Sequence, residues 1–293
     1  MIYIIVGPTC SGKTSIGIKL ADKLNAPIIN GDAFQIYQDM NIGTAKIEKD
    51  DPAYNKHYLL DIVKPDQTYS VKQYQDDFRK TMNKLMKAHE DVLVVGGTGL
   101  YIRAAIYDYI FNQEEETDTS ELEKLDNETL YQRLVELDKE AASKIHLNNR
   151  KRLIRAISMI ESSHLSKSEL INSQEHKLIY PEDEVKIFFI NPDRETLYKN
   201  INDRVDLMFK DDALINEVKS LKVKYELSLT AKQGIGYKEV LDYLDDKYSL
   251  EECKELIKKR TRNYAKRQVT FFKNQFKYQL FSSKYDLLKE FGL

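Results

Sequence analysis

The sequence predicts an α/β protein with a parallel-sheet core of the P-loop type, a mostly helical insertion and a helical C-terminal part. Short apolar runs rich in β-branched residues alternate with amphipathic helical stretches, and the first run leads into a glycine-bearing loop. Between residues 113 and 183 this alternation gives way to helical periodicity alone. Strands that alternate with helices form parallel sheets, because the helices supply the right-handed crossovers.

Four nearly continuous apolar runs are predicted to be strands that are buried on both faces. They cover residues 2–6, 27–30, 92–95 and 185–190. The helix predicted after the first strand carries Ile16, Leu20 and Leu24 on one face, and a second helical stretch spans about residues 70–89. From about residue 193 to the C-terminus the pattern is helical again, with one long helix over about 250–276.

The charge is distributed unevenly over these parts. The 293 residues include 45 Lys or Arg and 47 Asp or Glu, a net charge of −2, which excludes indiscriminate coating of nucleic acid. Residues 112–128 hold eight acids against Lys124, and we interpret them as a solvated loop or helix face. Residues 254–277 hold nine bases against Glu255. The predicted core is therefore 1–112 with 184–293, and the predicted insertion is 113–183.

Cysteine usage and hydropathy point to a reducing compartment. Cys10 and Cys253 are too few for a disulfide framework, and neither has a partner at zinc-finger spacing. No segment approaches the roughly 18 apolar residues that cross a bilayer, and the N-terminus lacks a basic region before its apolar run. We expect a cytoplasmic protein without membrane contact.

A phosphate-binding loop follows the first predicted strand. The octet Gly7-Pro8-Thr9-Cys10-Ser11-Gly12-Lys13-Thr14 matches G-x-x-x-x-G-K-[ST] and opens the first predicted helix. In such a loop the backbone N–H groups and the helix N-terminus surround phosphate oxygens, while Lys13 adds a point charge and Thr14 a hydroxyl for Mg²⁺. The loop therefore predicts a ligand with two or more phosphates. Its predicted phosphate-binding residues are Gly7, Thr9, Ser11, Gly12, Lys13 and Thr14.

The acids near the strand ends distinguish between phosphate ligands. Kinases and hydrolases of this class end another strand in Asp, but residues 92–95 lead into Gly-Gly-Thr-Gly, and Asp91 lies at the wrong end. Asp32, just past the second strand, is the acid best placed near the phosphate loop. Because strand ends form the ligand edge of a parallel sheet, Asp32 and Thr98 should meet the loop there. Asp32 could also be a helix cap or turn residue.

Eight segments, spread in order over nearly the whole chain, resemble the bacterial form of the tRNA dimethylallyltransferase (tRNA isopentenyltransferase) family. The phosphate loop is specific by itself, and the other segments are specific in combination. The segments are 7–14, 31–37 with 40–46, His57 with Asp61, 96–101, 152–156, Arg204-Val205-Asp206 with Met208, 234–239 and 261–268.

The resemblance implies transfer of the dimethylallyl group from dimethylallyl diphosphate to N6 of the adenine on the 3′ side of a tRNA anticodon (position 37). It also implies Mg²⁺ and the tRNA anticodon stem-loop as partners, and we expect a monomer. Asp32 suits a general base, because the exocyclic adenine amine must lose a proton as it attacks. The resemblance places Thr98 in the active site and Arg204 on the diphosphate. Alternatively, Thr98 caps a helix and Arg204 pairs with Asp203 or Asp206.

An anticodon-loop base must leave its stack to reach such a site, so RNA contacts are expected around it. Aromatic residues among the bases of the long helix could stack on RNA bases or belong to the core. The residues predicted to contact tRNA are Asp32, Ala33, Phe34, Gln35, Lys151, Arg152, Leu153, Ile154, Arg155, Arg262, Lys266 and Arg267.

Three other functions stay open at the level of sequence. A prenyltransferase acting on free adenosine phosphates would not need the insertion or the basic 254–277 stretch. A small-molecule kinase would share the loop but is disfavoured by the missing strand-end Asp. In an RNA-binding NTPase switch, Asp32 and Thr98 would be structural.

Overall fold

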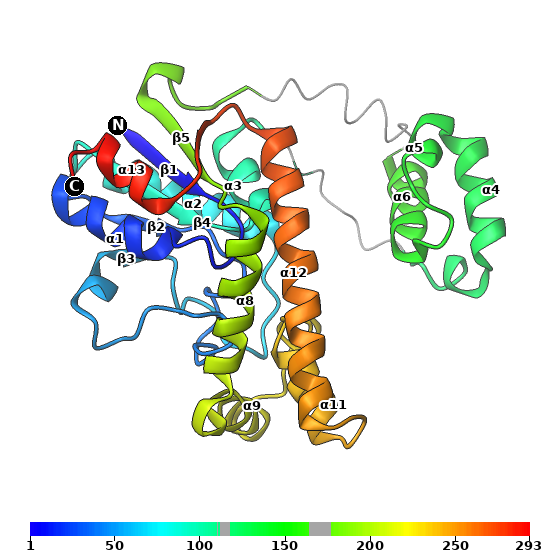
Figure 1. Ribbon diagram of the computed structural model, residues 1–293. Helices are drawn as coiled ribbons and strands as arrows, with labels where there is room; N and C mark the ends of the chain where they lie inside the picture. The colour runs from blue at the N-terminus through cyan, green and yellow to red at the C-terminus, as the bar shows by residue number, and fades with distance from the viewer. Residues whose placement is uncertain (110, 112–117, 164–176) are drawn as a thin grey trace. The chain divides into compact units, whose positions relative to one another are not determined.

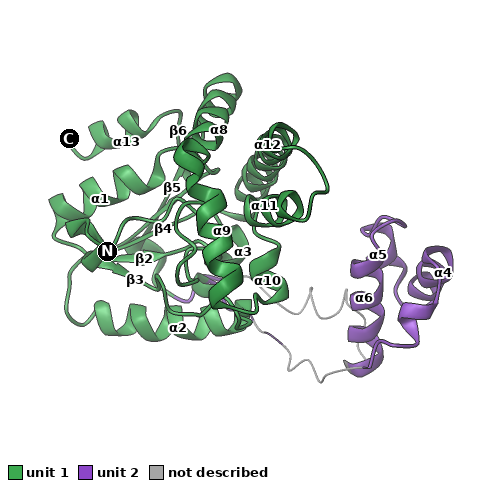
Figure 2. Ribbon diagram, turned by 90° about the horizontal axis from the view of Figure 1, so that it is seen from below, with its two compact units in different colours: residues 1–106, 180–293 green, residues 107–179 purple. Residues whose placement is uncertain are grey.

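The computed structural model describes residues 1–109, 111, 118–163 and 177–293. These residues form two compact units, one of residues 1–106 and 180–293 and one of residues 107–179 (Figure 2). Of the acidic run 112–128, predicted as a solvated loop or helix face, residues 112–117 lie outside the described residues, and the five acids from 118 onward are exposed. No helix in the described part of the chain is long and apolar enough to cross a membrane.

A six-stranded parallel sheet forms the centre of the first unit, in the order β3-β2-β4-β1-β5-β6 (Figure 1). Its strands are β1 Ile2–Val6, β2 Ile28–Asn30, β3 His57–Tyr58, β4 Val92–Gly96, β5 Val185–Ile190 and β6 Gln279–Phe281. The parallel α/β core and its four predicted strands are confirmed. The helical C-terminal part is also confirmed, although the sequence pattern did not predict the short strand β6 that lies in it. This edge strand has only one buried residue and so produces no apolar run.

The register of the strands brings three loops to one edge of the sheet. Val6 is level with Gly96 of β4 and with Phe189 of β5, and Asn30 of β2 is level with Val95. The loops that follow β1, β2 and β4 therefore begin side by side, as expected at the carboxyl ends of parallel strands. Gly96 allows this close approach, since a Cβ there would lie 2.2 Å from the Gly31 carbonyl.

Helices cover this sheet and extend beyond it. They are α1 Lys13–Leu24, α2 Val71–Leu85, α3 Gly99–Ile106, α8 Arg194–Met208, α9 Ala213–Lys224, α10 Leu229–Lys232, α11 Tyr237–Leu244, α12 Leu250–Gln275 and α13 Lys284–Glu290. Capping boxes begin α2 at Ser70 and α12 at Ser249, where each serine accepts a backbone N–H three residues on. The long helices α8 and α12 pack against each other (Figure 1).

The second unit is helical in its described part, as its periodicity predicts. It consists of the short 3₁₀ turn η2 Leu122–Lys124 and the helices α4 Asn127–Leu137, α5 Lys139–Ser143 and α6 Arg150–Ser163. Asp126 and Asp138 cap α4 and α5 through their side chains. The three helices enclose an aliphatic cluster that includes Leu130, Leu134 and Leu153.

Candidate active site

A cavity of about 520 Å³ opens at the edge of the sheet where the three loops meet, entirely within the first unit. It brings together residues from the phosphate loop, the Asp32 loop, the Gly-Gly-Thr-Gly turn, α8 and α12. The predicted site residues on its wall are Thr9, Gly12, Lys13, Thr14, Asp32, Phe34, Gln35, Arg204 and Arg267. The predicted residues Gly7, Ser11, Ala33 and Thr98 are not among its lining residues.

The phosphate loop has the backbone conformation that its sequence predicts. Gly12 has φ 88°, which favours glycine, and Gly7 packs so closely that a Cβ would lie 2.4 Å from the Ile190 carbonyl. The first turn of α1 has no side-chain cap, so its N–H groups stay available to an anion. Ser11 Oγ is buried without a hydrogen-bond partner among the described residues. Cys10, the other residue of the loop with positive φ, carries a free thiol.

Lys13 lies inside the phosphate loop, and its surroundings lower its pKa. Its Nζ donates a hydrogen bond to the Pro8 carbonyl at 2.6 Å. Burial lowers the pKa of Lys13 to about 8, against the charge of Asp32 and Cys10, which raise it, and with that of Arg204, which lowers it further. Lys13 and Arg204 thus bring two positive charges close together at the phosphate loop.

Arg204 of α8 points into the site and not along the helix surface. Its Nη1 donates to Thr9 Oγ1 at 2.9 Å, and its Nη2 donates to the Gly43 carbonyl at 3.1 Å. Its Nε is buried and has no partner among the described residues. Asp206 instead pairs with Lys258 at 2.9 Å. The alternative in which Arg204 pairs with a neighbouring Asp of α8 is therefore wrong.

Asp32 combines a turn contact with access to the cavity. Its Oδ1 accepts the Phe34 N–H at 2.9 Å, while Asn30 binds both backbone polar groups of Asp32 at 3.0 Å. Asp32 Oδ2 accepts no hydrogen bond from the described residues and stays available in the cavity. Thr98 Oγ1 accepts the Ala33 N–H at 3.0 Å, so Thr98 holds the Asp32 loop. The Thr98 hydroxyl therefore binds the Asp32 loop and does not cap α3.

Gln268 of α12 joins the phosphate loop to the Gly-Gly-Thr-Gly turn. Its Oε1 accepts the Thr9 N–H and its Nε2 donates to the Gly97 carbonyl, both at 2.8 Å. Any larger residue at position 97 would displace this amide, because a Cβ there would lie 2.4 Å from Gln268 Nε2. Sequence reasoning did not single out this residue. The only signal was its place at the end of the family segment 261–268.

The aromatic residues of α12 divide between core and cavity. Phe272 is fully buried and its ring packs 5.7 Å from that of Phe189, so it belongs to the core. Tyr264 lines the cavity, and the Arg267 guanidinium lies 5.7 Å from its ring centre. Burial and the charge of Asp32 raise the pKa of Tyr264 far above its usual range, so its hydroxyl stays protonated.

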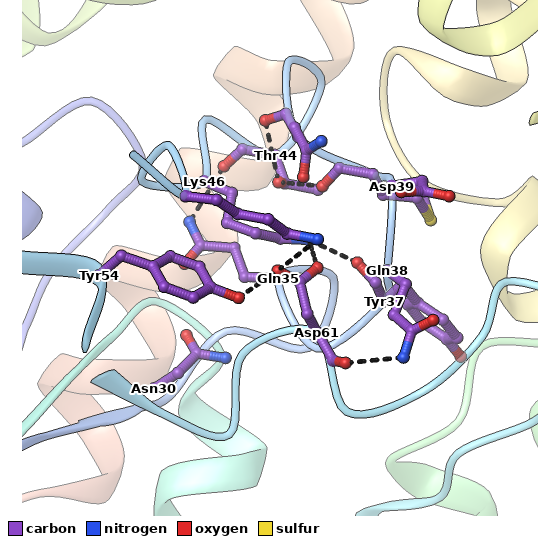
Figure 3. Close-up of polar contacts among 12 residues, drawn as sticks. Asn30, Gln35, Tyr37, Gln38, Asp39, Thr44, Lys46, Tyr54 and Asp61 are labelled. Carbon is purple, nitrogen blue, oxygen red and sulfur yellow. Dashed lines mark hydrogen bonds and ion pairs between the residues drawn. The ribbon is translucent and has the colours of Figure 1, made fainter. Parts of the chain in front are cut away.

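A buried ion pair forms at Lys46, directly after the cavity-lining residues 43–45. Lys46 donates to Asp61 Oδ1 at 2.6 Å and to the Tyr37 carbonyl, and the Tyr54 hydroxyl donates to Asp61 Oδ2 at 2.7 Å (Figure 3). The side chains of Lys46 and Asp61 are only 1% and 8% exposed. A buried charge needs such pairing and further hydrogen bonds. These bonds fix Lys46 and thereby the end of the segment 41–46.

Hydrogen bonds to Thr44 and Asp61 fix the position of Gln35. Its Nε2 donates to the Thr44 carbonyl at 3.1 Å, and its own carbonyl accepts the Asp61 N–H at 3.3 Å. Its side-chain oxygen is the group left to meet a ligand in the cavity.

The remaining predicted RNA contacts are not among the residues that line the cavity. Lys266 is exposed on α12, while Arg262 donates to Asn202 Oδ1 at 2.8 Å. In the second unit Lys151, Arg152 and Arg155 are exposed on α6. Two residues of the same helix face inward. Leu153 is fully buried and Ile154 packs partly against the same cluster, so Leu153 is corrected from an RNA contact to a core residue.

The donor atoms of the cavity fit a magnesium ion bound together with a phosphate ligand. Thr14 and Asp32 provide a hydroxyl and a carboxylate on the wall. Mg²⁺ prefers oxygen ligands and keeps several waters, binding through one or two protein groups and substrate phosphates. The described residues contain no group of three or more His, Cys, Asp or Glu that could hold a metal. Substrate oxygens would therefore have to complete the shell.

Comparison with known proteins gives consistent matches. The family model described as IPP transferase matches residues 35–275. A tRNA dimethylallyltransferase of Clostridioides difficile is 43% identical over 282 residues, covering 93% of this chain and 88% of that protein. A relative with the same name from Bacillus anthracis is 39% identical over 280 residues, covering 94% and 88%.

Solved structures of the same kind superpose on the chain. The tRNA isopentenylpyrophosphate transferase of Staphylococcus epidermidis matches with a TM-score of 0.70 at 36% identity, covering 99% of this chain and 96% of the other. A eukaryotic dimethylallyltransferase acting on tRNA matches with a TM-score of 0.78 at 27% identity, covering 97% and 74%. The family model, the relatives and the phosphate-binding cavity agree, and the chain belongs to the IPP transferase family, the tRNA dimethylallyltransferases.

Proposed function

We propose that this protein transfers the dimethylallyl group of dimethylallyl diphosphate to N6 of the adenine at position 37, next to the anticodon of a tRNA, and releases diphosphate. One observation carries the proposal. A single cavity joins a phosphate loop, an arginine with an unused buried N–H, and a carboxylate with an unused oxygen. These are the groups that a charged leaving group and a proton-losing nucleophile require.

The phosphate side of the cavity holds and stabilises the leaving group. The free N–H groups of the first turn of α1, the Lys13 ammonium and Arg204 Nε–H donate to the diphosphate oxygens. Negative charge grows on the bridging oxygen as its bond to C1 of the dimethylallyl group breaks, so prepositioned donors lower the barrier. Thr9 and Gly43 already fix the two other nitrogens of Arg204, so its positive charge is held beside the phosphate loop.

Asp32 serves the acceptor side. As the N6–C1 bond forms, one N6 proton passes to Asp32 Oδ2, and the electron pair of the broken C1–O bond leaves with the diphosphate. Such a positioned base contributes about 10²–10⁴-fold to the rate. Thr98 and Asn30 hold the loop in place, while Gln35 Oε1 can accept a hydrogen bond from the base.

Thr14, with Asp32 nearby, would hold Mg²⁺ against the diphosphate, where the ion would offset negative charge. The exposed bases of α6 (Lys151, Arg152 and Arg155) together with Lys266 would contact tRNA phosphates. These contacts supply affinity that falls with salt, whereas the cavity supplies the chemistry.

The test uses the purified full-length protein, Mg²⁺ and labelled dimethylallyl diphosphate. We expect label on a tRNA with adenine 3′ to its anticodon and none on the same tRNA with guanine there. Label on free AMP but not on tRNA would favour the prenyltransferase of free nucleotides. ATP turnover without prenyl transfer would overturn the proposal and favour a kinase or an NTPase switch.

A further inference from the structure

A carboxylate outside the cavity organises the loop that fixes Arg204. The backbone over residues 41–43, which we name the 41–43 loop, lies beside α9 and α11. Glu217 of α9 accepts three consecutive N–H groups of this loop, from Asn41 at 3.0 Å, Ile42 at 2.8 Å and Gly43 at 3.3 Å. No feature of the sequence singled out Glu217, which is 174 residues from Gly43.

A fourth donor reaches the same carboxylate. The Tyr237 hydroxyl of α11 donates to Glu217 Oε1 at 2.7 Å. The Tyr237 ring also packs directly on Gly43, where an added Cβ would lie 2.4 Å from a ring carbon. Glu217 therefore receives four hydrogen bonds, which an ionised carboxylate with two oxygens can accept together.

The 41–43 loop connects Glu217 to the diphosphate site through the carbonyl group of Gly43. Gly43 donates its N–H to Glu217, and its carbonyl accepts Arg204 Nη2 at 3.1 Å. Arg204 Nη1 reaches Thr9 of the phosphate loop, which leaves only the buried Nε without a partner among the described residues. If Gly43 moved, Arg204 Nη2 would lose its acceptor and Nε would lose its direction, while Nη1 would keep only Thr9 Oγ1 and the more distant Cys10 Sγ at 3.8 Å.

We propose that Glu217 is a positioning residue of the diphosphate site, acting through Gly43 on Arg204. The inference rests on the proposed function for its meaning, but its test uses binding of inorganic pyrophosphate and needs no transfer reaction. Glutamine cannot replace the carboxylate, because its single side-chain oxygen accepts two hydrogen bonds and its amide N–H₂ would face other donors.

The experiment is a double-mutant cycle with the full-length protein, measuring the Kd of pyrophosphate by calorimetry in the presence of Mg²⁺. We expect Glu217→Gln to raise this Kd about tenfold, as for loss of a charge-assisted hydrogen bond. In an Arg204→Ala background the same change should raise the Kd less than twofold, because residues that act as a unit are not additive.

Asp193→Ala is the matched control, since Asp193 also accepts a backbone N–H and caps α8, the helix of Arg204. We expect it to lower the Tm and to leave the Kd unchanged. An equal rise in Kd for Glu217→Gln in both backgrounds, or no rise in either, would overturn the inference. A protein that binds pyrophosphate as expected but transfers no dimethylallyl group would contradict the proposed function alone.

Discussion

The cavity of the first unit and the helical second unit both contain residues that sequence reasoning placed near tRNA, but they are built differently. Around the cavity, polar side chains are constrained by partners far away in the chain, as Thr9 is by Gln268 and Arg204. In the second unit an aliphatic cluster holds α4–α6 together, and Lys151 and Arg152 are exposed on the surface.

The difference separates two kinds of function. Catalysis needs donors and acceptors fixed within about 0.5 Å, which a network of hydrogen bonds among rigid elements can achieve. Exposed lysine and arginine side chains are mobile and suit the more tolerant task of attracting phosphates. Chemistry should therefore respond to changes in the cavity, whereas changes in the second unit should alter RNA affinity or the stability of that unit and leave the cavity unchanged.

Substitution of Asp32 should have the largest effect. Asp32→Asn keeps an oxygen for the Phe34 N–H but removes the proton acceptor, so we expect the single-turnover transfer rate to fall by about 10²–10⁴-fold. The Kd of tRNA, measured by filter binding, should stay within about twofold of wild type, since a neutral amide of the same size preserves the surface. A near-normal rate would show that Asp32 is only a turn residue.

A core substitution in the second unit should lower the stability of that unit and leave pyrophosphate binding by the cavity unchanged. Leu153 is fully buried, so Leu153→Ala should destabilise this unit by about 2–5 kcal/mol, measured by hydrogen exchange of α4–α6. Leu137→Ala is the control, because Leu137 is 38% exposed and should lose less than about 1 kcal/mol. Pyrophosphate binding should be unchanged in both variants. Weaker pyrophosphate binding in Leu153→Ala would mean that the cavity depends on the second unit.

The smallest predicted effect is a pH dependence that belongs to the cavity. Lys13 has its pKa lowered to about 8 in the free protein, so its ammonium is lost above that pH unless a bound diphosphate holds the proton. The Kd of pyrophosphate for wild type, divided by that for Lys13→Arg at the same pH, should be constant below about pH 8 and rise above it, by up to about tenfold per pH unit. The ratio removes the ionisation of pyrophosphate itself, and arginine stays protonated throughout. A ratio that stays constant to pH 10 would contradict the role of Lys13.

Local sequence patterns were sufficient to predict the site groups that lie close together in the chain. The glycine spacing predicts the loop around Lys13, and the buried run before Asp32 places that residue at a strand end, where the structure also has it. Arg204 was different, since its helix alone favoured a surface ion pair and only the family resemblance pointed to the diphosphate.

Other parts of the site could not be predicted from these patterns. Gln268, Glu217 and the Lys46–Asp61 pair became visible only through their partners. Leu153 was misplaced because a basic segment hides which of its residues faces inward. In each case the sequence shows a residue type on a helix or loop, while the packing of elements decides which atom it meets.

The sequence by itself determined the parallel core, the phosphate loop and the strand ends that carry Asp32 and Thr98, because these depend on the order of apolar runs and glycines over a few residues. Only the tertiary structure decided which side chains hold those groups. Gln268 and Glu217 act on loops 259 and 174 residues away, and contacts of that separation depend on how α12 and α9 dock against the sheet edge and its loops.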